Sequence, residues 1–137
     1  MKMIGNTARA RQHLLLSTGQ CGHSYRGLGF QAPGNKGKPG EYIVMHPYDG
    51  NKGKSLVEDA TIHDVTAHKR VAGLVQGAGW DGDDNNALVA FTLRDNPGET
   101  TKTGFAQVTS GLEILQDLAN SDGRDNVKVV DCGIVLF

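Results

Sequence analysis

Apolar residues recur at helical spacing in two short segments of the chain. The first, "NTARARQHLLLSTG" at residues 6–19, carries three consecutive leucines in its last turns. Asn6 or Thr7 is placed to cap the start of a helix, and Gly19 lies just beyond its end. This pattern predicts a short amphipathic helix.

The second segment, "TSGLEILQDLANSDG" at residues 109–123, predicts another helix. Ser110 and Glu113 have the spacing of a capping box, in which each side chain bonds a backbone N–H of the first turn. Four apolar residues share one helical face: Leu112, Leu115, Leu118 and Ala119.

Elsewhere, apolar residues come in short runs that glycine-rich turns separate. Five runs predict strands, at residues 41–48, 70–76, 87–93, 104–108 and 126–137. The runs do not alternate regularly with helices, which disfavours a βαβ fold. We therefore expect a mostly β fold, an antiparallel sheet or barrel whose openings are capped by two α-helices.

The length of 137 residues predicts a single domain, residues 1–137. The net charge of -1 conceals an asymmetry. Residues 1–70 hold ten Lys/Arg against five Asp/Glu, a net +5, and residues 71–137 hold four against ten, a net -6. Either the two halves interleave and their fields cancel, or they form a dipolar surface that steers a charged partner.

No apolar run approaches the roughly 20 residues that span a bilayer, and the first residues lack the apolar stretch of a secretion signal. We expect no membrane association and a cytoplasmic or nuclear location. Cys21 and Cys132 lie far apart without metal-ligand spacing, which favours two buried free thiols over a disulfide.

Motifs for nucleotides and metals are incomplete. "GKS" at 53–55 has Tyr48 where a phosphate-binding loop needs glycine. "WDGDDNN" at 80–86 lacks the central glycine and the final glutamate of a calcium loop. His63 and His68 have awkward spacing for a shared zinc ion, and no serine lies in a nucleophile elbow. We expect no cofactor and no metal.

Two copies of "GNKGK", at 34–38 and 50–54, form basic turns around the predicted strand at 41–48. They supply four lysines for possible contact loops: Lys36, Lys38, Lys52 and Lys54. Tyr42 and Tyr48 share a strand face between these turns and could stack on bases. Binding of nucleic acid or another polyanion is therefore an alternative, which the negative net charge disfavours.

Three segments in order resemble the cyclophilins. "NTARARQHLLLSTGQCGHSYRGLGF" at 6–30 is similar to the family's first helix, "ALSTGE" and "YKGSxFHR" strand. "GKSLVED" at 53–59 is similar to "GKSIYGEKFEDE", and residues 104–137 resemble the closing helix and "DCG" strand. The resemblance covers nearly the whole chain and implies a β-barrel with one helix at each opening.

The chain begins where cyclophilins already have two strands, so the resemblance implies a barrel without its N-terminal strands. Such a barrel would expose strand edges, which recruit or require a partner strand. Three explanations stay open: the domain is shortened, another segment of a longer protein supplies the strands, or a second copy of the chain covers the edge. In each case we expect an exposed edge to be completed by a partner strand or by self-association.

Cyclophilins are prolyl isomerases, and the arginine after "FH" in "FHR" stabilises the twisted amide. The matching strand here reads Phe30-Gln31-Ala32, and no arginine occurs between Arg26 and Arg70. Matching by the family's motifs gives a former isomerase groove of nine residues: Phe30, Gln31, Ala32, Tyr42, Met45, Ala87, Val89, Pro97 and Lys102. A lysine of the neighbouring turn would not replace the planar fork of an arginine.

The sequence thus predicts a divergent, non-catalytic cyclophilin-like domain that binds a protein or peptide. A weak prolyl isomerase that uses other residues is the enzymatic alternative. The polyanion-binding domain is the third.

Overall fold

The computed structural model describes residues 1–4, 7–46, 67–77, 88–121 and 126–134. Its elements, in chain order, are β1 (Lys2–Met3), α1 (Thr7–Thr18), β2 (Tyr42–Val44), β3 (His68–Arg70), β4 (Leu74–Gly77), β5 (Val89–Thr92), β6 (Asn96–Thr101), β7 (Gly104–Gln107) and α2 (Leu112–Ala119).

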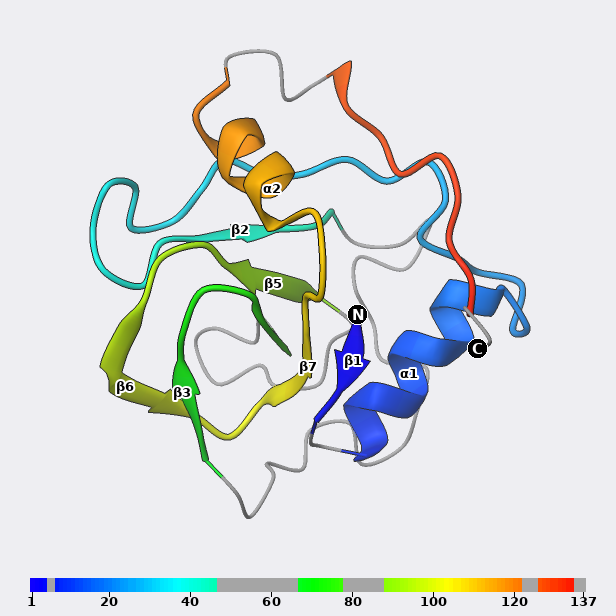
Figure 1. The fold of residues 1–137 in the computed structure, drawn as a ribbon. Helices are drawn as coiled ribbons and strands as arrows, with labels where there is room; N and C mark the ends of the chain where they lie inside the picture. The colour runs from blue at the N-terminus through cyan, green and yellow to red at the C-terminus, as the bar shows by residue number, and fades with distance from the viewer. Residues whose placement is uncertain (5–6, 47–66, 78–87, 122–125, 135–137) are drawn as a thin grey trace.

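In the described ranges, seven strands form two antiparallel sheets (Figure 1). The larger has five strands in the order β1-β7-β4-β5-β2, and the smaller pairs β3 with β6. The prediction of a mostly β, antiparallel fold with two helices is confirmed. The described residues do not form a closed barrel, because β1 and β2 end the larger sheet without pairing with each other.

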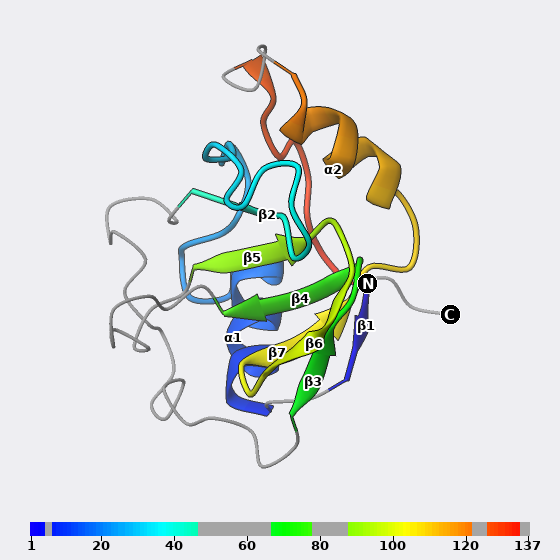
Figure 2. The same ribbon diagram turned by 90° about the vertical axis from the view of Figure 1, so that its left-hand side faces the viewer.

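The hydrophobic core lies between the five-stranded sheet and the two helices. Helix α1 lies against one face of the sheet, and α2 lies beyond β2 and β5 (Figure 2). Leu16 of α1 is fully buried and packs in the same cluster as Phe105 of β7 and Leu118 of α2. Burial of these side chains stabilises the fold by about 2 kcal/mol each.

The two predicted helices form, but one of their caps differs. Helix α1 ends as expected, since Gly19 has φ 72° and its N–H donates to the carbonyl of Leu15. The capping box predicted for α2 is wrong: the N-cap is Gly111, with φ 85° and no side-chain cap bond. The helix starts one residue later than expected, which puts Glu113 one position too early to complete the box.

Three predicted strands, at 41–48, 87–93 and 104–108, contain β2, β5 and β7. The predicted strand at 70–76 is instead divided, because Gly73 with φ 96° turns the chain between β3 and β4. Residues 126–134 of the last predicted strand contain no strand. Only Val129 there exchanges two backbone hydrogen bonds with residues 27 and 28, while Val130 is 85% exposed.

The cysteines are free, as expected, but not both buried. Cys21 is exposed and Cys132 is half-buried. None of the helices within the described ranges is long and apolar enough to cross a membrane.

Candidate binding site

Three residues of the predicted isomerase groove lie together, within or against the core. Phe30 forms a bridge with Met45, whose N–H donates to the carbonyl of Val89 at 3.0 Å. The Phe30 ring lies 6.3 Å, centroid to centroid, from that of Phe91. Met45 and Val89 are buried, so their side chains fill the interior and do not line an exposed surface.

Gln31 and Ala32, which follow Phe30, are both exposed. The N–H of Gln31 donates to the carbonyl of Val44 at 2.8 Å, which pairs this segment with the outer side of β2. Ala32 stands where the resemblance places the catalytic arginine, and a methyl group has no hydrogen-bond donor for a twisted amide. The described strand therefore lacks the cationic group on which the family's catalysis depends.

Tyr42 lies opposite Gly34 in an antiparallel bridge. Its ring occupies the space that a side chain at position 34 would need. An aromatic ring over a cross-strand glycine restores packing that the glycine lacks. Tyr42 is therefore explained by packing at the edge of β2.

The remaining groove residues are placed elsewhere. Pro97 lies in β6 and Lys102 directly follows it, and both are exposed. Pro97 belongs to the β3–β6 sheet, whereas Tyr42 and Val89 lie in the five-stranded sheet. Ala87, Lys52 and Lys54 lie outside the described residues.

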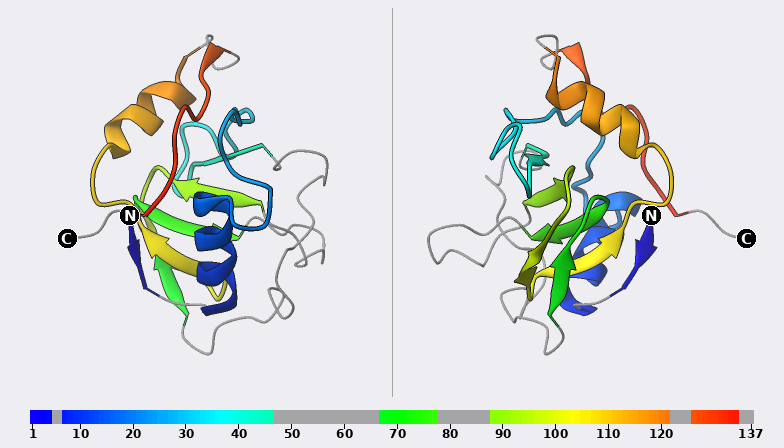
Figure 3. Two further views of the ribbon diagram at one scale, coloured as in Figure 1. Left: turned by 90° about the vertical axis from the view of Figure 1, so that its right-hand side faces the viewer. Right: turned by 60° about the vertical axis from the view of Figure 1, so that its left-hand side comes forward.

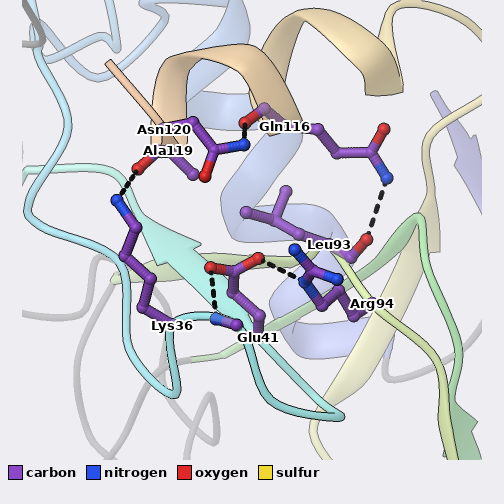
Figure 4. Close-up of polar contacts among 8 residues, drawn as sticks. Lys36, Glu41, Leu93, Arg94, Gln116, Ala119 and Asn120 are labelled. Atoms are coloured by element: carbon purple, nitrogen blue, oxygen red, sulfur yellow. Dashed lines mark hydrogen bonds and ion pairs between the residues drawn. The ribbon is translucent and has the colours of Figure 1, made fainter.

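The loop that carries Lys36 and Lys38 is tied to α2 and to the end of β5 (Figure 4). Lys36 Nζ donates to the carbonyl of Ala119 at 3.1 Å, at the C-terminus of α2, where the helix dipole favours a cation. Lys38 is exposed. One of the two described lysines of the predicted contact loops thus already has a structural partner.

Glu41 fastens the other end of this loop. Its side chain is 4% exposed and accepts hydrogen bonds from the N–H of Gly37 at 3.1 Å and from Arg94 Nε at 2.9 Å. Gln116 of α2 adds a bond to the carbonyl of Leu93 at 2.9 Å (Figure 4). These contacts hold the loop in one place, as a rigid contact surface requires.

A cavity of about 780 Å³ lies at the opposite end of the five-stranded sheet. Its walls come from β1, α1, the residues after β7 and the end of the 126–134 segment, which converge near the N-terminus (Figures 1 and 3). The lining residues are Met1, Lys2, Met3, His13, Leu14, Ser17, Thr109, Ser110, Cys132, Gly133 and Ile134. This volume lies within the range of protein ligand sites.

His13 forms a neutral polar contact in the wall of this cavity. Its Nδ1 atom is 3.0 Å from the hydroxyl of Tyr25, and its ring packs at 5.1 Å and 5.3 Å from the rings of Tyr25 and Phe105. Burial lowers the pKa of His13 to about 4, and the nearby N-terminal ammonium acts in the same direction. Burial also raises the pKa of Tyr25 above its ordinary value. Both groups are therefore uncharged near pH 7.

Beside the cavity, strand β1 has one paired edge and one open edge. Lys2 pairs with Gln107, Met3 pairs with Ala106, and the N–H of Ile4 donates to the carbonyl of Phe105 at 2.9 Å. Bonding groups alternate along an antiparallel strand, so the N–H and C=O of Met3 point away from β7. Within the described part of the chain, no strand pairs with this outer edge.

The sequence contains a weak signal for this site. Met1, Lys2 and Met3 alternate apolar and charged residues as a half-buried strand does, but the run is too short to distinguish it from a disordered start. The cavity itself depends on residues more than 100 positions apart, such as Met3 and Cys132. No periodicity reports such a contact.

Comparison with known proteins adds no relative: no family model matches the chain, and no curated protein is similar to it. The cyclophilin resemblance therefore remains a prediction. Among the residues described, no three His, Cys, Asp or Glu side chains are grouped so that they could hold a metal ion.

Proposed function

We propose that the chain is a non-catalytic interaction domain that binds an extended segment of a partner protein along the outer edge of β1. The observation that carries this proposal is the open edge itself, where the N–H and C=O of Met3 face away from β7. An unpaired edge offers main-chain hydrogen bonds to an added strand, and adjoining pockets for alternate side chains give specificity. The cavity adjoins this edge.

A partner segment suits this edge better than a second copy of β1. Strand β1 has only two residues, so β1 paired with β1 would form few hydrogen bonds. A longer segment from another protein would continue past β1 and also contact the cavity. The proposal thus places a partner strand at the open edge of β1.

For the fold, we propose a divergent cyclophilin-like barrel. The antiparallel strands and the two helices support this proposal. Ala32 in place of the arginine and the burial of Met45 and Val89 support the loss of isomerase activity. The engagement of Lys36 with α2 argues against a polyanion site built on the described lysines.

Amide hydrogen exchange, measured by NMR on ¹⁵N-labelled protein, tests the edge. The probe is a synthetic eight-residue peptide that alternates apolar residues with threonine, and the control is the same peptide N-methylated at every second amide. We expect the first peptide to slow exchange of the Met3 N–H and the control to have no effect. The N–H of Ile4, already bonded to Phe105, should change little. Equal effects of both peptides, or an unaffected Met3, would refute strand addition.

Two further measurements test the remaining parts of the proposal. Light scattering over a range of concentrations should show a constant monomer mass, and a dimer joined through β1 would make the second copy the occupant instead. Exchange NMR of an X-Pro peptide should show no acceleration of cis/trans isomerisation by catalytic amounts of the protein. Acceleration would contradict the non-catalytic assignment.

A further inference from the structure

Two polar side chains of α1 face the cavity beside β1. His13 and Ser17 are four residues apart and lie on one face of the helix, and both line the cavity. Ser17 is only 8% exposed and lines the cavity wall one helical turn after His13. A ligand hydroxyl placed against this wall can donate a hydrogen bond to the Ser17 hydroxyl or accept one from it.

The Nδ1 atom of His13 is bonded to Tyr25, so the other ring nitrogen, Nε2, is the atom that remains for a ligand. If Nδ1 donates to Tyr25, Nε2 is an acceptor, and if Nδ1 accepts, Nε2 is a donor. A hydroxyl group satisfies either tautomer, because it both donates and accepts. A carboxylate satisfies only the second.

The rest of the wall is mainly apolar, with Met3, Leu14 and Ile134 among its residues. A group that fits it has an apolar body and a hydroxyl at its tip, as the phenol of tyrosine does. At about 780 Å³ the cavity is larger than any single side chain. In an extended segment, residues two positions apart point to the same side, so a second side chain can enter from the same strand.

We propose that this cavity recognises a tyrosine in the segment bound to β1, with the phenol hydroxyl at His13 and Ser17 and a second apolar side chain two residues away. The inference rests on the proposed function, since the edge of β1 presents the segment. It adds the specificity of that binding: an aromatic hydroxyl is required at one position, and any large apolar residue serves at the other.

Two small molecules test the pocket without a peptide. NMR titration of the full chain should show saturable binding of p-cresol at the cavity and about tenfold weaker binding of toluene, which lacks the hydroxyl. Ser17→Ala should reduce this preference severalfold. Thr18→Ala is the matched control, because the Thr18 hydroxyl bonds the carbonyls of Leu14 and Leu15 and does not line the cavity. Equal binding of p-cresol and toluene would overturn the role of the hydroxyl.

A pair of peptides separates this inference from the proposed function. The strand-forming peptide is prepared with tyrosine or with phenylalanine at the position that faces the cavity, and protection of the Met3 N–H is measured. Tighter binding of the tyrosine peptide, lost in Ser17→Ala, supports both proposals. Equal protection by both peptides overturns the tyrosine specificity and leaves strand addition standing. If neither peptide protects Met3 while p-cresol still binds through Ser17, strand addition is overturned and the pocket chemistry stands.

Discussion

The imidazole of His13 and the phenol of Tyr25 meet at 3.0 Å beside the core, both uncharged near neutral pH. An ordinary histidine titrates near 6.5, whereas burial holds the pKa of His13 at about 4. Between these two pH values, the unfolded chain binds a proton that the folded chain does not. The free energy of unfolding must therefore fall as the pH falls from 6.5 to 4, by up to about 3 kcal/mol, and must not change further below that window through this group.

Urea unfolding of the wild type and of His13→Gln at several pH values between 7.5 and 4 measures this contribution, since glutamine cannot titrate. We expect the difference in free energy between the two proteins to shrink as the pH falls. If the difference in free energy of unfolding between the two proteins stays constant with pH, His13 has the same pKa in the folded and unfolded chains, which contradicts the prediction.

Glu41→Gln should lower the free energy of unfolding by about 1–2 kcal/mol. The carboxylate is nearly fully buried and accepts from both Gly37 and Arg94, and an amide puts a donor against one of these donors. Glu99→Gln is the control, because Glu99 also pairs with an arginine, Arg70, but is 53% exposed. Its effect should stay within about 0.5 kcal/mol, as for other exposed ion pairs. Equal losses in urea unfolding would mean that Glu41 does not fasten the loop.

Gly73→Ala should cost about 1–3 kcal/mol, because residue 73 has φ 96°, where an L side chain is strained. Gly98→Ala in exposed β6 should change the free energy of unfolding by less than about 0.5 kcal/mol. Thermal and urea unfolding of both variants give these values. A harmless alanine at 73 would indicate that residues 70–76 form one continuous strand, as the sequence pattern predicts.

Lys36→Ala should reduce the free energy of unfolding by about 0.5–1 kcal/mol through loss of the charge-assisted bond to the end of α2. Lys38→Ala, in the same loop and likewise exposed, should have less than half this effect, because it removes no bond to the end of α2. Titration with single-stranded DNA at low salt supplies the functional comparison. If Lys36→Ala weakens DNA binding and leaves stability unchanged, Lys36 contributes to a polyanion site and not to the helix end.

The secondary structure was predictable where local chemistry decides it. The core strands β5 and β7 follow from apolar spacing, and the end of α1 follows from the placement of Gly19. The amphipathic pattern expected for α1 is wrong, because Arg9, Gln12, His13 and Ser17 are buried beside Leu16 whereas Leu14 is 38% exposed. The N-cap of α2 was not predictable from the sequence. Ser110 and Gly111 are both candidates for this position, and the structure has Gly111 there, in the left-handed conformation. Strand β6, "NPGETT", contains proline and glycine and is mostly exposed, so only its pairing with β3 makes it a strand.

The candidate site was harder to predict than the fold. The resemblance to the family's motifs predicts that Met45 and Val89 line a surface groove, but both side chains are buried. A match between sequences does not show which face of a strand is buried. The cavity joins the first and last described segments of the chain through α1. The alternation of apolar and charged residues from Met1 to Met3 is a weak indication of β1. The pocket forms only because the tertiary fold brings Ser17 and His13 of α1 beside this strand.

The place of Met1 in the cavity wall also bears on any polypeptide joined ahead of it. Such an extension would start next to the outer edge of β1, where the partner segment is proposed to bind. The effective concentration of this attached extension at the outer edge of β1 would depend on the length of the tether. For a short flexible tether it would be in the millimolar range, whatever the concentration of the protein in solution. An extension able to form a strand would thus inhibit binding of a partner segment competitively and within the same chain. The partner segment would bind only after it displaced this extension.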